Sequence, residues 1–182
     1  MSKVILVVLV AFLGVVTAAI VDWDAVDDEP FLFKRRPESV NIRRCLAAHN
    51  EYRRRHGAPP LIWDTELAND AQNYANKLAA EHAFRHDQKE LTVKNEGENL
   101  ASSMGAKLDC AGATKLWYDE VKDYDFSHPG FNHKTGHFTQ VVWKATKRVG
   151  VGISSSGKEY RVVARYSPPG NYFGQFAENV ER

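Results

Sequence analysis

The sequence Gly136-His137-Phe138-Thr139-Gln140-Val141-Val142-Trp143-Lys144-Ala145-Thr146 is the most informative part of this chain. It places a histidine and a threonine beside an aromatic and aliphatic run that must be buried. Residues 136–143 predict one or two helical turns. An imidazole in so apolar a segment is either a hydrogen-bonded core histidine or part of a site, and for an isolated histidine the core position is the commoner case. The rest of the chain has to decide between them.

Two strands are predicted directly after this segment. Residues 149–154 and 160–167 alternate well enough for two antiparallel strands. The turn between them is expected at Ser155-Ser156-Gly157-Lys158, and Pro168-Pro169-Gly170-Asn171 ends the predicted sheet.

Three helices are predicted upstream. The first covers residues 39–56, with Ser39 as the expected cap and Gly57 as the stop. The second begins after Asp64, and the third covers residues 110–124. Three helices and a small sheet in this order predict a layered α+β domain.

The second helix carries an apolar stripe rich in alanine, which implies that another element packs close against it. We expect this stripe to continue into His82 and His86, so that His86 lies in register with the buried face. The two histidines are four residues apart, a spacing that lets two imidazoles bind one metal ion. Ala83 stands where a metalloprotease helix carries glutamate, so a protease-type zinc helix is not predicted.

Two glutamates have different expected surroundings. In the third helix, Glu120 falls on the apolar face with Trp117, whereas Asp119 falls on the opposite face. A carboxylate on an apolar face must be paired or hydrogen-bonded, because burying it bare is very costly, and histidines are the available partners. Glu98 follows Gly97 in a short segment of small, polar and apolar residues, and on its own it is expected to be a surface carboxylate.

Size and charge restrict the classes of function. The chain has 182 residues, enough for one domain with a substantial core. Its formal charge is +1 and charged residues make up 26%, so no global electrostatic field recruits nucleic acid or membrane. The triplet Arg53-Arg54-Arg55 is expected on the solvated side of the first helix, and no nucleic-acid partner is predicted.

The N-terminus has the pattern of a targeting segment. Lys3 precedes an unbroken apolar run over residues 4–16, and Thr17-Ala18-Ala19 offers small residues for cleavage. The run is short for a membrane span, which needs about 20 residues. The mature protein is therefore expected to be secreted and extracellular. The expected organisation is a signal peptide over residues 1–19, an acidic and then basic lead-in linker over 20–38, and a domain over 39–182.

Two cysteines, Cys45 and Cys110, lie beyond the predicted signal peptide. In an oxidising compartment two remaining thiols pair more often than they stay free. We therefore expect a disulfide that ties the first helix to the start of the third.

Four motifs now resemble those of a known family. The segment 136–143 resembles the first signature of the CAP superfamily, which comprises cysteine-rich secretory proteins, antigen 5 proteins and pathogenesis-related 1 proteins. Tyr166-Ser167-Pro168-Pro169-Gly170-Asn171-Tyr172 resembles the second signature, His49-Asn50-Glu51-Tyr52-Arg53 the first helix, and Gly97-Glu98-Asn99-Leu100 the GEN motif. The match covers about residues 40–180 and is most similar to the short Golgi-associated, plant pathogenesis-related-like branch. The resemblance implies a three-layer α-β-α sandwich with a small antiparallel sheet.

The resemblance also implies a central cleft with two histidines and two glutamates, here His86, Glu98, Glu120 and His137. For Glu98 it overrides the surface expectation. His86 and His137 are the expected ligands of a zinc ion. A tight zinc site needs three or four protein ligands, so we expect weak Zn²⁺ binding that is lost as the histidines protonate near about pH 6.

A ligand-binding role is the expected function. The resemblance implies sterol or fatty-acid binding by an aromatic loop, here Tyr124, Phe126, Pro129 and Phe131, although these side chains could equally cap the core. No nucleophile–base pair is evident, so we expect a non-enzymatic binder of a sterol or other lipid, with a role in defence or host interaction. The alternatives are a metal-dependent secreted peptidase and a receptor-binding immune or venom effector. We also expect contact with a membrane surface or a receptor. The protein is expected to be a monomer or a weak homodimer.

Overall fold

The computed structural model of this protein describes residues 39–182. The predicted signal peptide and the lead-in linker lie outside the described residues. Between residues 39 and 182, no helix is long and apolar enough to cross a membrane.

The described chain alternates helices and strands. In order, they are α1 (Ile42–Arg55), β1 (Ile62–Trp63), α2 (Thr65–Ala80), α3 (Gln88–Lys94), β2 (Gly97–Met104), α4 (Cys110–Tyr118), the 3-10 helix η2 (Asp119–Asp123), α5 (Gly136–Val142), β3 (Arg148–Ser156), β4 (Glu159–Ser167) and α6 (Phe176–Asn179).

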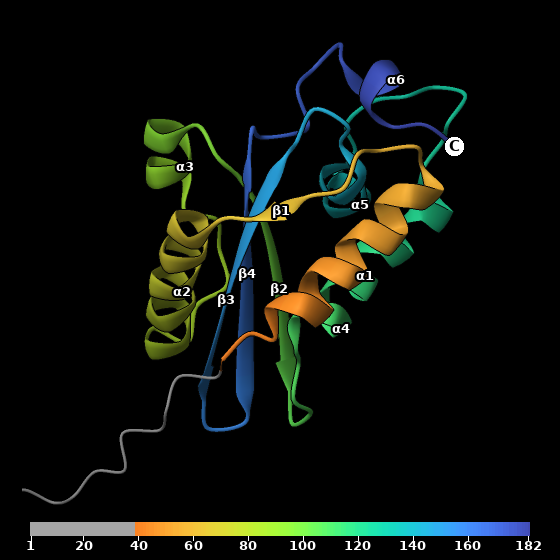
Figure 1. The fold of residues 1–182 in the computed structure, drawn as a ribbon. Coiled ribbons are helices and arrows are strands. Elements are labelled where there is room, and N and C mark those ends of the chain that lie inside the picture. Colours follow the sequence, from red (N-terminus) through yellow and green to blue (C-terminus); the bar gives the residue numbers. More distant parts are fainter. Residues whose placement is uncertain (1–38) are drawn as a thin grey trace, which may run out of the picture. The chain divides into compact units, whose positions relative to one another are not determined.

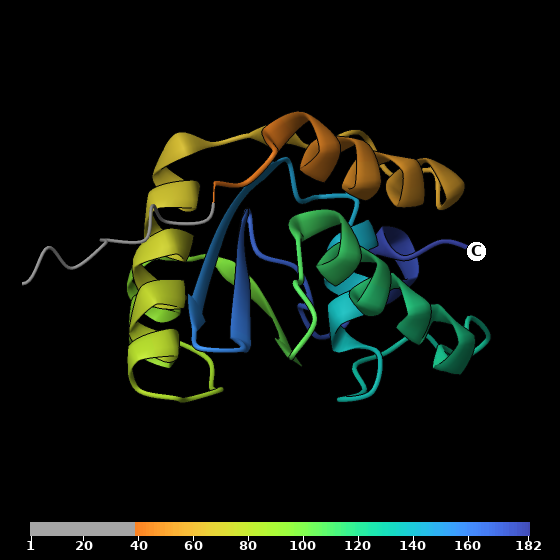
Figure 2. The same cartoon turned by 90° about the horizontal axis from the view of Figure 1, so that it is seen from below.

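These elements form three layers, with one sheet between two layers of helices (Figure 1). The strand order is β1-β3-β4-β2, and β4 runs antiparallel to both β3 and β2. Helix α2 covers one face of the sheet, and α1, α4 and α5 lie on the other side, as the view in Figure 2 shows. The predicted three-layer α+β sandwich is confirmed. The sheet is not wholly antiparallel, because the two-residue β1 pairs with β3 in parallel.

The close contact expected along the alanine stripe of α2 is present. Residues of this stripe are buried, and α2 lies against β3 and β4. Two glycines of β3 make the approach possible: a Cβ atom at Gly150 would overlap the backbone of Ala68, and one at Gly152 would overlap that of Gln72. At these two positions of β3, only glycine leaves room for the helix backbone.

The predicted helix limits need three corrections. Helix α1 begins later than expected, since the side chain of Asn41, and not Ser39, accepts the capping hydrogen bond, from the Arg44 N–H at 3.0 Å. Helix α2 ends at Ala80 and does not reach the two histidines, because His82 has a φ of 49°, outside the helical region. The third predicted helix changes at Tyr118 from the α-helix α4 to the 3-10 helix η2.

Arg53 was expected on the solvated side of the first helix, and that prediction is wrong. Its side chain is fully buried. The guanidinium donates hydrogen bonds to the carbonyl oxygens of Pro59 at 2.7 Å and of Val141, Trp143 and Thr146 at 2.9 Å each. Burial lowers its pKa to about 10, which leaves it charged at neutral pH. Arg53 therefore holds the end of α5 to α1.

The predicted disulfide between Cys45 and Cys110 is confirmed. The bond joins α1 to the first residue of α4, and the two Cα atoms are 5.3 Å apart. Both cysteines belong to the main buried core.

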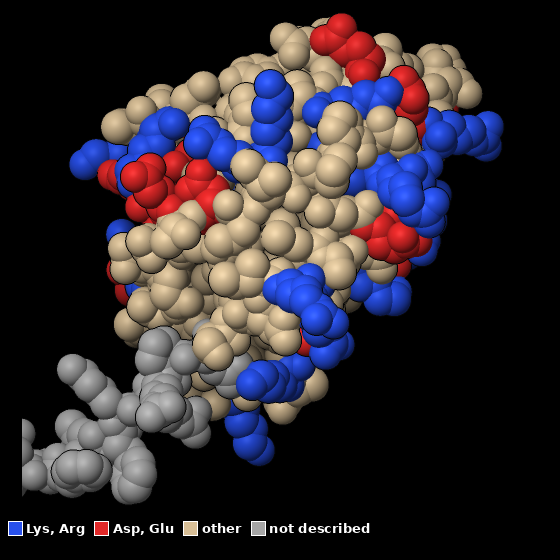
Figure 3. All heavy atoms as spheres, in the orientation of Figure 1, with Lys and Arg blue, Asp and Glu red and all other residues tan. Residues whose placement is uncertain are grey.

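The surface charges are mixed in sign. On the face drawn in Figure 3, lysine and arginine side chains occur alongside aspartate and glutamate, and neither sign covers the face. This pattern agrees with the formal net charge of +1.

Candidate functional site

The four residues assigned to the cleft form two histidine–glutamate pairs. His86 Nδ1 lies 2.8 Å from Glu98 Oε1, and His137 Nδ1 lies 2.7 Å from Glu120 Oε1. A carboxylate oxygen only accepts, so each Nδ1 carries the proton and each neutral ring keeps its lone pair on Nε2. Within residues 39–182, neither Nε2 atom has a hydrogen-bond partner.

The side chain of Glu98 is fully buried, so the surface position expected from its own segment is wrong. The register of β2 and β4 places it opposite Arg165, whose Nε lies 3.1 Å from Oε2. The N–H group does not point along this line, so the contact is an ion pair without a directed hydrogen bond. The Asp87 N–H donates to Oε1 at 3.2 Å. A neighbouring cation and a backbone donor thus compensate the buried carboxylate.

His86 belongs to the site for a different reason from the one expected. It lies in the loop after α2, and 43% of its side chain is exposed. The prediction that it continues the buried stripe of the helix is therefore wrong. Its hydrogen bond to Glu98, from a distant strand, is what holds it.

The second pair is built around the start of α5. Glu120 projects from η2, and its Oε2 accepts hydrogen bonds from the N–H groups of His137 and Phe138, both at 3.0 Å. The residue that precedes the helix, Thr135, makes no side-chain cap. Glu120 takes over this role and places its negative charge at the positive end of the helix.

Strand β2 connects the two pairs. Successive side chains of a strand point to opposite faces, so Glu98 and Asn99 lie on different sides of the sheet. The Asn99 side chain donates to the carbonyl oxygen of His137 at 3.0 Å. Among residues 39–182, no three of the cleft residues place ligand atoms within 4.8 Å of one another. They therefore offer two histidine nitrogens rather than a compact cage.

The predicted sterol loop divides into two parts. Tyr124 and Phe126 pack on the core, with ring centroids 5.4 and 6.2 Å from that of Phe138. For these two, the structure has the core-capping arrangement. Pro129 and Phe131 are exposed, and the ring of Phe131 meets that of Phe173 at 6.2 Å. Sequence reasoning missed Phe173, although its position two residues after the second-signature asparagine was a signal.

The family assignment now rests on a direct comparison. The model of the cysteine-rich secretory protein family, CAP, matches residues 46–166. This chain belongs to the CAP family. The prediction from the four motifs is confirmed.

Relatives of this CAP protein come from distant organisms. It is 46% identical over 140 residues to the Golgi-associated plant pathogenesis-related protein 1 of Homo sapiens, covering 74% of this chain and 88% of that protein. It is 39% identical over 132 residues to the basic form of pathogenesis-related protein 1 of Nicotiana tabacum, covering 71% of each. The crystal structure of NaASP2 with Zn²⁺ superposes with a TM-score of 0.66 at 22% identity, over 82% of this chain and 90% of that one. That similarity shows the shared fold.

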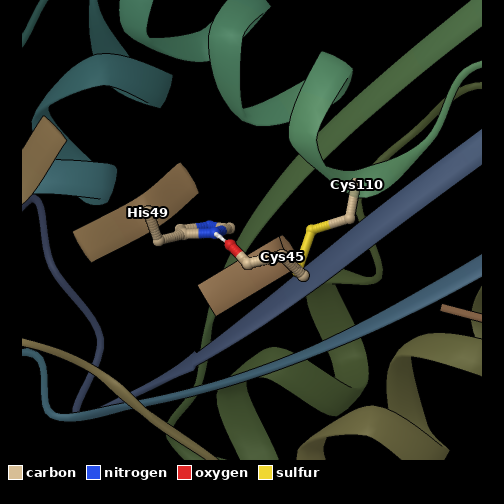
Figure 4. A group of neighbouring side chains, drawn as sticks. All are labelled: Cys45, His49 and Cys110. Carbon is tan, nitrogen blue, oxygen red and sulfur yellow. Dashed lines mark hydrogen bonds between the residues drawn. A yellow bond between two sulfur atoms is a disulfide. The ribbon is translucent and has the colours of Figure 1, made fainter. Parts of the chain in front are cut away.

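One further group in this CAP domain has the spacing of metal ligands. Cys45, His49 and Cys110 each offer an atom within 4.8 Å of the others (Figure 4). Two of these atoms are joined in the disulfide, so they are not thiolates. His49 is fully buried, and its desolvation lowers its pKa to about 4. With the bridge closed, the group is a structural part of the core.

The sequence places His49 only in the motif that resembles the first helix of the family. The available signal was its spacing of four residues from Cys45, which puts both side chains on one helical face. In the structure, His49 Nδ1 lies 3.1 Å from the carbonyl oxygen of Cys45, and Nε2 lies 3.0 Å from the hydroxyl of Tyr166.

Proposed function

We propose that this CAP-family protein binds a sterol or another lipid without chemically converting it. The observation that carries the proposal is the pair of exposed rings, Phe131 at 40% and Phe173 at 85% exposure, in edge-to-face contact. Aromatic rings offer rigid apolar faces, and burying them stabilises a complex by about 25 cal/mol per Å² removed from water. A flat, fused-ring lipid fits such a surface.

The remaining residues of the loop act as its support in this proposal. Tyr124 and Phe126 anchor the start of the loop on the core, and Pro129 stiffens the exposed turn that leads to Phe131. At the other end of the loop, Gly136 leaves room for the Phe131 ring, because a Cβ on Gly136 would lie 3.1 Å from that ring. The ligand contact would then involve Phe131 and Phe173, and the anchors would fix where these rings lie.

A binding assay with radiolabelled cholesterol tests this function. We expect Phe131→Ala combined with Phe173→Ala to weaken binding by about tenfold, because a loss of roughly 1.4 kcal/mol of apolar contact is one factor of ten. Leu116→Ala is the matched control, since Leu116 is an apolar side chain on α4 that is 51% exposed. The control should bind like the wild type.

The assay also separates the lipid proposal from its alternatives. His137→Ala should bind cholesterol nearly as well as the wild type, because a charged site contributes little to an apolar ligand. If the wild type binds neither cholesterol nor any free fatty acid at micromolar concentration, the lipid function is wrong. A peptidase or a receptor-binding effector would then be the better assignment.

A weak zinc site is the second part of the proposal. Support comes from the two histidine rings: each is held through Nδ1 by a glutamate, and neither Nε2 has a hydrogen-bond partner among residues 39–182, as in carboxylate–histidine–metal arrangements. His86 and His137 would hold the ion, and Glu98 and Glu120 would orient them. A bound zinc ion would supply Lewis acidity. Two protein ligands make the affinity low.

Secretion is the third part of the proposal. It is supported by the apolar run over residues 4–16 and by the small residues Thr17-Ala18-Ala19 that follow it. N-terminal sequencing of protein recovered from the medium of expressing cells should give a mature start at Ala19 or Ile20. Recovery in the membrane fraction with Lys3 still present would contradict secretion.

A further inference from the structure

We propose that reduction of the Cys45–Cys110 bridge converts it, together with His49, into a buried site for a soft divalent metal ion such as Zn²⁺. The ligand atoms of the three residues already lie within 4.8 Å of one another (Figure 4). This site is separate from the His86 and His137 pair and does not depend on the function proposed above. The closed disulfide keeps it switched off.

The donor set suits zinc once the bridge is open. Two thiolates and one imidazole are preferred zinc ligands, and three protein ligands leave one position open. Thr114 Oγ1 is close enough to form a hydrogen bond to a ligand atom, since it lies 3.2 Å from His49 Nδ1 and 3.9 Å from Cys110 Sγ.

The bridge is buried, with Cys45 at 0% and Cys110 at 4% exposure. A cavity of about 190 Å³ reaches it, and both cysteines line that cavity. Cys110 is also the first residue of α4, a position where the helix N-terminus stabilises a thiolate. The other residues that line the cavity are Ser39, Asn41, Arg44, Lys107, Asp109, Ala111 and Ile153.

The redox step balances with a dithiol as the reductant. One reductant thiolate attacks a sulfur of the bridge, the Cys45–Cys110 bond breaks, and a mixed disulfide forms. The second reductant thiol then attacks that mixed disulfide and leaves as an oxidised cyclic or protein disulfide. Two electrons pass to the bridge and two protons complete the thiols of Cys45 and Cys110. Metal binding then releases two protons as both thiols become thiolates.

Coordination also requires a tautomer change at His49. With the bridge closed, Nδ1 donates its proton to the Cys45 carbonyl oxygen and Nε2 accepts from the Tyr166 hydroxyl. Nδ1 is the nitrogen on the side of the cysteines, so its proton must move to Nε2 when the metal binds. The Tyr166 oxygen then accepts from Nε2, which is the outer partner that metal-bound histidines usually have.

Cobalt titration of the full chain, once with the bridge oxidised and once with it reduced, tests the proposal. The protein is reduced with a phosphine, excess reductant is removed without air, and Co²⁺ is added. The reduced wild type should develop a thiolate-to-cobalt charge-transfer band in the near ultraviolet, and Zn²⁺ should remove it. The oxidised wild type should show no such band. His133→Ala should behave like the wild type, because that exposed histidine is not one of the three ligands.

Two variants and one folding control make the test decisive. His49→Gln should bind Co²⁺ at least about tenfold more weakly when reduced, since even the loss of an outer partner costs 10–100-fold. Cys45→Ser with Cys110→Ser should show no band, and its near-ultraviolet circular dichroism reports whether the fold survives without the bridge. No band in the reduced wild type, an unchanged affinity in His49→Gln, or loss of the folded signal on reduction would each overturn the proposal.

Discussion

Glu120 and His137 make two contacts at once: the carboxylate accepts from the His137 ring at 2.7 Å and from the His137 backbone N–H at 3.0 Å. The same side chain therefore orients a candidate ligand and caps the helix that carries it. At the other end of α5, the Arg53 guanidinium binds the carbonyl oxygens of Val141 and Trp143. A negative group at the start and a positive group at the end both match the helix dipole.

Glu120→Ala should lower the free energy of unfolding by about 1–3 kcal/mol, because two backbone N–H groups lose their acceptor. Urea denaturation followed by circular dichroism measures this. Asp119→Ala is the matched control on the neighbouring residue: its carboxylate is exposed and pairs with Lys115, so its removal should cost no more than about 1 kcal/mol. Equal losses in the two variants would show that Glu120 does not act as the cap.

Arg53→Met should be severely destabilising, by roughly 3 kcal/mol or more, since it leaves several buried carbonyl oxygens without donors. The methionine keeps much of the side-chain volume, so the loss reports the hydrogen bonds and not a cavity. Arg54→Met changes an exposed residue of the same triplet and should stay within about 0.5 kcal/mol of the wild type. Thermal and urea unfolding of both variants would decide, and a mild effect at Arg53 would contradict this assignment.

Stability should fall in mild acid because of His49. Its pKa is lowered from 6.5 to about 4 by burial in the folded state, so only the unfolded chain binds this proton between those values. The contribution of the neutral His49 ring to the free energy of unfolding is complete above pH 6.5. It is lost progressively as the pH falls and stops changing below about pH 4. The total is on the order of 3 kcal/mol.

Unfolding free energies measured across that pH range test the assignment. His49→Gln should flatten the pH dependence, whatever its effect on stability at pH 7. His133→Gln, which replaces an exposed histidine, is the control and should keep the wild-type slope. A slope that survives in His49→Gln would assign the acid sensitivity to other groups.

Isothermal calorimetry of the oxidised protein should detect weak zinc binding that requires both cleft histidines. His86→Ala and His137→Ala should each reduce the affinity by at least about tenfold, because each removes one of two protein ligands. His82→Ala is the matched control, since His82 is also exposed and also pairs with a glutamate, Glu159. Equal zinc affinity in the wild type and His137→Ala would remove the cleft as a metal site.

The sequence alone determined the family and the layered fold. Its strongest signals were local: the segment around His137 forms a short helix, and Asp64 caps α2 through the N–H groups of Glu66 and Leu67. Parity and compartment were enough to predict the bond between Cys45 and Cys110. Such features depend on neighbours along the chain or on composition, which a sequence displays directly.

Only the tertiary structure decided which polar groups are buried, and how. Arg53 looked like a surface residue because its acceptors lie outside its own helix. One is the carbonyl oxygen of Pro59, and others come from the end of α5, far along the chain. Glu98 tolerates full burial because β4 sets Arg165 opposite it, and His86 reaches Glu98 from a loop after its helix has ended. Periodicity describes one helix or strand at a time. The compensation of a buried charge is a contact between distant segments, so it is fixed only when they pack together.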